Sequence, residues 1–380
     1  MGTPRWRYEG AVPMPGFPIV DPIPLPAPVW LFKLLHIVTL SLHFVAMETL
    51  VGALLIAALL NLLGRSGSTN LAAGAIARRL TVVMTYVINL GVPPLLFAQV
   101  LYGRAIYTSS VLIGAYWISV IPALVLVYWL LYRFAAGIEE GRKVWWMALL
   151  AWIITGGIAD VYTTNMTLML RPEVWQKMYS ASPLGTHLPT GDPTGLPRFL
   201  FMLIGGFVAA GLWLIYLSGR KSFVEVDRRY LSVLGGRIAG IGSIGQLIAA
   251  YAVYHAQPIV VQAALNEHLL YKIAGLGWLL LEMLILIFAG FVAISRPMGA
   301  ETSWVAVLLS FLSIALMTLY RDGIRDFTLL SKGYDVWQRT VVTNWSVVGL
   351  FLVLFVAGLG MVGWLISVVA RAERVMERAI

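Results

Sequence analysis

Cysteine is absent from this sequence of 380 residues, which excludes disulfides, iron–sulfur clusters, thiolate zinc sites and covalently attached haem. Charge is also scarce, because Asp, Glu, Lys and Arg together make up only 12% of the residues. Apolar residues make up 59%, and the mean hydropathy is +0.83. A soluble globular chain of this length does not need so much apolar surface. The composition therefore predicts a protein that crosses a membrane many times.

About nine apolar stretches are long enough to cross a bilayer, for which about 20 residues suffice. They cover residues 30–63, 80–101, 111–134, 144–170, 199–217, 231–254, 268–294, 303–320 and 341–369. The expected fold is an all-α polytopic membrane helix bundle. Most Lys and Arg residues lie in alternate connections, so the positive-inside rule places the N-terminus outside and the C-terminus in the cytoplasm of an inner-membrane protein. The net charge of +9 reflects this topology and not nucleic-acid binding.

The N-terminal region lacks the apolar core of a cleavable signal peptide. Residues 1–29 are rich in proline, which fixes φ and removes a backbone donor, so a helix or a central strand is excluded there. We expect an extracytoplasmic arm that lies over the protein or a partner subunit, or else a loose tail. The predicted domains are this arm, a transmembrane bundle over residues 30–370 and a cytoplasmic tail over residues 371–380.

Ionisable side chains interrupt several of the apolar stretches. The first stretch contains His36, His43 and Glu48, and burying such groups in hydrocarbon costs several kcal/mol unless they are paired. A neutral imidazole inside a helix bundle is a common axial ligand of b-type haem, which makes His43 a candidate metal ligand; the alternative is a hydrogen bond to a neighbouring helix. Asp160 and Glu282 lie in later stretches. With Glu48 they form a candidate proton or polar path, or each bonds locally.

A run of paired charges ends the eighth stretch, where the sequence reads YRDGIRDF from residue 320. On a helix, Arg321 and Arg325 share one face, and Asp322 and Asp326 share another. The run is either a solvated cap or a binding site for a carboxylate, such as a haem propionate or an anionic partner, because the guanidinium fork matches carboxylates.

Several short segments, spread over most of the chain, together resemble one known protein family. They are His43 with Phe44 and the small residues after it, and residues 88–103, 165–172, 197–211 and 321–326. Together with nine spans and an outside N-terminus, they resemble subunit I of the cytochrome bd quinol oxidases. The resemblance implies a high-spin haem at His43 and places Gln99, Arg321, Asp322 and Arg325 near the cofactors.

The departures from that family concern its haem ligands and its proton channel. This chain has Gln99 where the family has a second-span glutamate, and Leu124 where it has a third-span glutamate. It has Phe201 in place of the low-spin haem histidine, and Ile273 or Ala274 in place of the methionine opposite that histidine. The quinol-binding loop of the family is shortened here to residues 255–267. His43, and Asp322 in place of a glutamate, remain as candidate iron ligands. We therefore expect no low-spin haem at Phe201. The scaffold resembles a bd subunit that serves another respiratory complex.

The leading hypothesis is a membrane subunit of a respiratory electron-transfer complex, which couples the quinone pool to an extracytoplasmic redox partner and holds a b-type haem. The alternative is a haem-free structural anchor for redox subunits. A transporter that uses Glu48, Asp160 and Glu282 is a third hypothesis, but no inverted repeat supports it.

Other membrane subunits, the lipid bilayer and a c-type cytochrome or similar redox subunit are the expected partners. The arm, the 171–198 loop and the 320–339 segment should share the extracytoplasmic side. Their aromatic residues would form the docking face or else sit at the lipid headgroups. These residues are Trp175, Tyr179, Tyr334 and Trp337.

Overall fold

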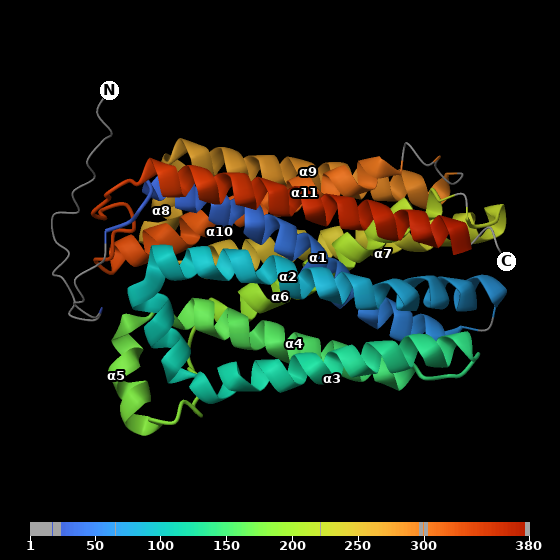
Figure 1. The fold of residues 1–380 in the computed structure, drawn as a ribbon, viewed down its shortest axis with the longest axis horizontal. Coiled ribbons are helices and arrows are strands. Elements are labelled where there is room, and N and C mark those ends of the chain that lie inside the picture. The colour runs from blue at the N-terminus through green and yellow to red at the C-terminus, as the bar shows by residue number, and fades with distance from the viewer. Residues whose placement is uncertain are drawn as a thin grey trace.

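The computed structural model describes residue 17 and residues 24–64, 66–220, 222–295, 299 and 303–376. Within these ranges the chain forms eleven helices (Figure 1). They are α1 (Val29–Leu63), α2 (Gly67–Leu112), α3 (Gly114–Glu139), α4 (Trp145–Leu168), α5 (Pro172–Ala181), α6 (Gly195–Ser218), α7 (Glu225–His255), α8 (Ile259–Glu267), α9 (Leu269–Ile294), α10 (Trp304–Ser331) and α11 (Trp345–Met376). All except α5 and α8 are long and apolar enough to cross a membrane, so 9 spans are found in this part of the chain. The predicted all-α membrane bundle is confirmed.

The long helices run side by side, and their connections gather at the two ends of the bundle (Figure 1). The start of α1, the short helices α5 and α8, and the connection from α10 to α11 lie at one end, which we call the α5/α8 end. The 171–198 and 320–339 segments meet there, as expected, since Lys332 Nζ lies 2.9 Å from Glu173 Oε2. The C-terminal end of α11 lies at the opposite end.

The described part of the proline-rich arm lies across the α5/α8 end. The backbone N–H of Leu25 donates to the carbonyl of Thr340 at 2.9 Å, and Val342 N–H donates to the carbonyl of Leu25 at 2.9 Å. The Phe17 ring packs 5.4 Å from the Trp175 ring. The extended-arm prediction therefore agrees with these residues, whereas residues 1–16 and 18–23 lie outside the described ranges.

Several sequence-based boundaries were wrong, because helix continues through segments expected to be polar links. α2 begins at Gly67, where the Ser66 side chain accepts a backbone hydrogen bond from the first turn, and it continues to Leu112 with a kink at Tyr102. α10 continues to Ser331, so the charged run is helical and is not a solvated cap. α11 extends through residues 371–376 of the expected tail. Hydropathy placed the end of the eighth stretch at residue 320 because charged residues follow. These charges are paired inside the bundle, so the helix continues through them.

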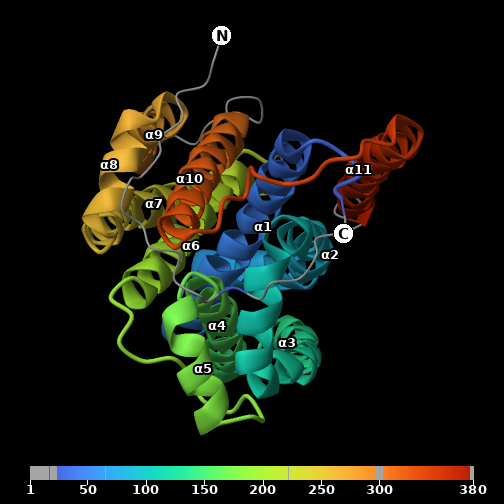
Figure 2. The same ribbon diagram turned by 90° about the vertical axis from the view of Figure 1, so that its left-hand side faces the viewer.

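α1 is the central helix of the bundle (Figure 2). It contacts α2, α4, α6 and α10, and 67% of its most apolar 18-residue stretch is buried, against 6% of the corresponding stretch of α11. Glycine permits the closest approach: a side chain at Gly52 would overlap the carbonyl oxygen of Gly206 on α6. Gly211 and Gly235 meet in the same way between α6 and α7. Small residues commonly allow such contacts between membrane helices.

Candidate functional site

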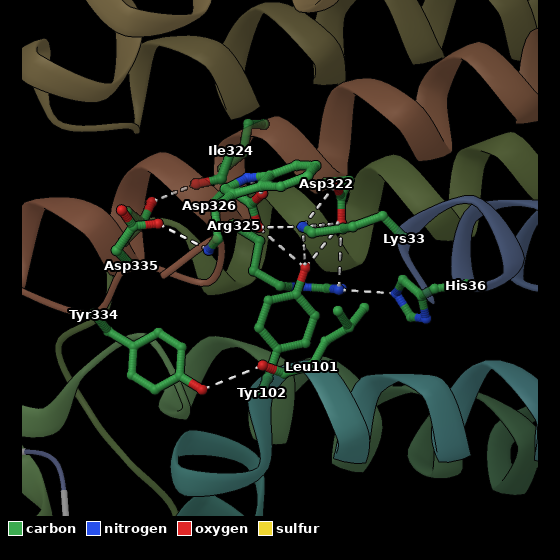
Figure 3. A network of polar contacts seen from close by, with 12 residues as sticks. Lys33, His36, Leu101, Tyr102, Asp322, Ile324, Arg325, Asp326, Tyr334 and Asp335 are labelled. Carbon is green, nitrogen blue, oxygen red and sulfur yellow. Dashed lines mark hydrogen bonds and ion pairs between the residues drawn. The ribbon is translucent and has the colours of Figure 1, made fainter. Parts of the chain in front are cut away.

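A buried charge network joins α1, α2 and α10 near the α5/α8 end (Figure 3). Lys33 on α1 lies between the two carboxylates of the charged run, 3.0 Å from Asp322 Oδ2 and within ion-pair distance of Asp326 Oδ1. All three side chains are almost completely buried. Trp337 Nε1 donates to Asp326 Oδ2 at 3.3 Å, so the segment after α10 is tied to the same carboxylate. The charged run is therefore an interior element of the fold.

Three further residues, Tyr102, Arg325 and His36, complete this network. The Tyr102 hydroxyl lies at the α2 kink, accepts from Lys33 Nζ at 2.7 Å and donates to Asp322 Oδ1 at 2.9 Å. Arg325 Nη1 donates to His36 Nε2 at 2.9 Å, and His36 Nδ1 donates to the carbonyl of Pro94 at 3.0 Å. Both nitrogens of His36 thus have partners, and its ring is neutral in this arrangement. Two cations and two carboxylates balance each other in the network.

Arg321, the first residue of the charged run, is left out of this balance. No carboxylate within the described ranges forms an ion pair with it, and its guanidinium donates no hydrogen bond to a described residue. Its contact is the Phe44 ring on α1, with the guanidinium carbon 5.4 Å from the ring centroid. A partly buried guanidinium with donors to spare is suited to an acceptor supplied by another molecule.

A cavity of about 520 Å³ lies beside Arg321, between α4, α6, α7, α9 and α10. Phe201, Met202, Trp278 and Met317 give it apolar walls. Arg198, Arg321, Arg325 and Lys272 make its polar part basic, and Arg198 Nη2 donates to Gln257 Oε1 at 3.0 Å. The volume lies within the range of about 300–1,000 Å³ typical of ligand sites. The arrangement suits an amphipathic molecule with acceptor oxygens at one end.

The carboxylates expected to form a polar path do not all meet. Glu48 on α1 and Glu282 on α9 are 2% and 1% exposed, and they act electrostatically on one another. Asp160 lies on the exposed side of α4 and belongs to neither this pair nor the charge network.

The residues expected near cofactors are also divided. Gln99 accepts a hydrogen bond from the Tyr107 hydroxyl at 3.5 Å and lies outside the charge network. Asp322 has both carboxylate oxygens bonded to Lys33, so it does not fit as an iron ligand. His43 donates from Nδ1 to the Val87 carbonyl at 3.0 Å, which leaves Nε2 with its lone pair. That pattern fits a haem ligand, because a bond to the second ring nitrogen fixes the tautomer.

Lys33, Tyr102 and Arg198 belong to the site but were not predicted from the sequence. Lys33 offered a signal, since it is a lone cation inside the first apolar stretch and lies about one helical turn before His36. Tyr102 offered none, because its importance depends on the kink in α2. Arg198 lies directly before the fifth stretch, in the position of an ordinary interfacial cation.

No family model matches this chain, and no curated protein matches it.

Proposed function

We propose that this chain is a membrane subunit of a respiratory electron-transfer complex and that its cavity binds the headgroup of a quinone. The cavity beside Arg321 carries this proposal. A quinone has two acceptor oxygens on a flat ring and a long apolar tail. The basic groups and the apolar walls of the cavity suit these two parts.

The cavity is also reachable from the bilayer. Tyr251 on α7 and Leu276 on α9 line it, yet they are 69% and 54% exposed on the outside of the bundle. A tail can therefore leave past these two side chains into lipid while the headgroup stays inside. A ligand that arrives from water would not need this lateral apolar opening.

Arg321 has the clearest role in this proposal. Its guanidinium would donate to a quinone oxygen and would offset the negative charge that develops there when the quinone takes up electrons. The neutral charge network holds α10 in place, so that Arg321 lines the cavity and forms no ion pair with a described carboxylate. Arg198 adds a second guanidinium to the lining of the cavity, close enough to act electrostatically on Arg321.

We propose further that His43 ligates a b-type haem through Nε2, which would supply one-electron chemistry to the complex. The hydrogen bond from Nδ1 to Val87 supports this role. His43→Ala should lose haem absorbance in the purified complex while the protein still inserts. An unchanged ratio of haem to protein would contradict the assignment, and Phe201→Ala offers a control that removes no nitrogen ligand.

We place the protein in the cytoplasmic membrane, with the α5/α8 end as the docking face for an extracytoplasmic redox partner. Tyr179 and Trp337 are each 52% exposed there, whereas Trp175 and Tyr334 are buried within the chain itself. The first two therefore remain available as anchors for a partner. The apolar outer face of α11 is available to lipid or to another membrane subunit.

Quinone binding to the purified protein in lipid nanodiscs tests the function, with quenching of tryptophan fluorescence as the readout because Trp278 lines the cavity. Arg321→Leu should weaken binding by about 10-fold or more, since a hydrogen bond to a charged group contributes about 1.5–3 kcal/mol. Arg142→Leu, at an exposed position near the opposite end, is the matched control. Equal affinity in both variants, or no binding to the wild type, would favour the structural anchor instead.

A further inference from the structure

A layer of apolar side chains closes the inner end of the cavity. Phe44, Phe201, Trp278 and Met317 pack together in one cluster, and the last three line the cavity. About one helical turn deeper, roughly 6 Å along each helix, a second set of residues follows. Each residue of the first set is paired with a deeper residue four positions away on the same helix. The pairs are Phe44 and Glu48 on α1, Phe201 and Gly205 on α6, Ala250 and Gln246 on α7, Trp278 and Glu282 on α9, and Met317 and Ser313 on α10.

The deeper residues form a polar cluster around Gly205. A Cβ atom at Gly205 would lie 3.1 Å from Glu48 Oε1 and 2.7 Å from Gln246 Nε2, so these two side chains meet at the glycine. The Ser313 hydroxyl donates to Glu282 Oε1 at 2.7 Å. Four helices thus bring polar groups to the middle of the bundle, directly below the apolar layer.

Four oxygen atoms in or beside this cluster are buried without a hydrogen-bond partner among the described residues. They are Glu48 Oε1, Gln246 Oε1, Glu282 Oε2 and Ser243 Oγ. The carboxylate and amide oxygens only accept, whereas the Ser243 hydroxyl carries a hydrogen that it can donate to Glu282. A buried acceptor without a partner costs about 1–3 kcal/mol, so the remaining acceptors are not expected together without a compensating hydrogen or positive charge.

Among the described residues, the surrounding helices supply no cation to this cluster. α6 contributes Gly205, α7 contributes Gln246 and Ser243, and α10 contributes Ser313. Glu282 is the charged group that acts on Glu48. His43, on the same helix as Glu48, bonds to α2, and Arg321 lies beyond the apolar layer.

We propose that Glu48 and Glu282 form a proton-holding site in the membrane interior, shared with Gln246 and Ser243. A proton on one carboxyl makes an O–H donor for an orphaned acceptor and removes one of two like charges. A metal cation is less suited, because calcium and magnesium take about six or more oxygen ligands and the cluster offers four orphaned oxygens.

The position of the site suggests its use, and this step rests on the proposed function. Reduction of a quinone takes up two electrons, here from the redox partner, and two protons, one at each oxygen. The carboxyl pair lies one helical turn from the cavity, with the Phe201 and Trp278 layer between. A proton that leaves Glu48 or Glu282 for a quinone oxygen is replaced from the opposite end of the bundle.

Infrared spectroscopy of the wild-type protein in nanodiscs at neutral pH, without quinone, tests the site. We expect a carbonyl band of a protonated carboxyl that shifts when glutamate is labelled with ¹³C, and that is reduced in Glu48→Gln or Glu282→Gln. Asp160→Asn is the control and should leave the band unchanged. A wild-type spectrum without a glutamate-sensitive band would overturn the proposal, and this measurement does not depend on the folding of any variant.

A carbodiimide that modifies protonated carboxyls provides the second readout, with mass spectrometry to locate the label. Labelling of Glu48 or Glu282 that sodium does not suppress supports a proton site, whereas suppression by sodium would show a cation site instead. Added quinone should shift the infrared band in the wild type. A band that is present but unmoved, in a protein that binds no quinone, would contradict the proposed function and leave the proton site standing.

Discussion

Replacement of Lys33 by methionine tests whether the charge network holds the α5/α8 end together. Methionine keeps the apolar length of the side chain, so the substitution removes mainly the ammonium group. It would remove the ion pairs to Asp322 and Asp326 and the hydrogen bond to Tyr102. Arg325 is the remaining cation in the network, and its Nη1 lies 4.0 Å from Asp322 Oδ1. Two buried carboxylates would then be left with one cation, and that cation is at the distance limit of an ion pair with Asp322.

The expected cost is about 3–5 kcal/mol, the loss typical when one partner of a buried ion pair is removed. The full range applies because Lys33 and Asp322 side chains are only 5% and 4% exposed, so water cannot screen the charges left behind. Lys33→Met combined with Asp326→Asn restores the charge balance and should lose less than the sum of the two single variants.

Reversible unfolding in mixed micelles, followed by circular dichroism, measures these differences. Lys177→Met on the exposed side of α5 is the matched control and should change the free energy of unfolding by less than about 0.5 kcal/mol. A loss below about 1 kcal/mol in Lys33→Met, or strict additivity in the double variant, would refute the network as a stabilising element.

Two further perturbations probe other contacts. Gly52→Ala should separate α1 from α6 and destabilise the protein by about 1–3 kcal/mol, because its Cβ would overlap the Gly206 carbonyl oxygen. Gly349→Ala on α11 is the control in the same unfolding assay. It should be neutral, since a Cβ atom there meets nothing within 4 Å. Partial burial acts to raise the pKa of Glu173, but the hydrogen bond from Lys332 and the nearby positive charge outweigh it and hold that pKa below its ordinary value of 4.5. The contribution of this pair to stability is therefore complete above pH 4.5 and is lost as the pH falls through the lowered pKa. The melting temperature of the wild type should then fall more steeply in acid than that of Glu173→Gln. Parallel dependence of the two melting temperatures on pH would contradict the pairing.

The sequence alone predicted the class of the protein and the number of its spans. The reason is that hydropathy is a local property: a run of about 20 apolar residues is stable only as a helix in lipid, whatever its neighbours are. The same logic located Glu48, Glu282 and Arg321, since ionisable residues inside apolar runs are rare enough to attract attention. It failed at Gly67 and at Ser331, where helix continues through polar sequence.

Only the tertiary structure decided which of these polar groups meet. Lys33 is separated from Asp322 by 289 residues and from Asp326 by 293, and no local pattern relates them. The helical period places Arg321 and Arg325 on one face of α10, and both line the cavity, yet the packing of α1 brings only Arg325 into the charge network. Likewise Glu48 and Glu282 come together, and Asp160 does not, because helix packing sets which faces of α1, α4 and α9 point inward. Local composition determined that the chain lies in a membrane, and contacts between distant helices determined where its chemistry lies.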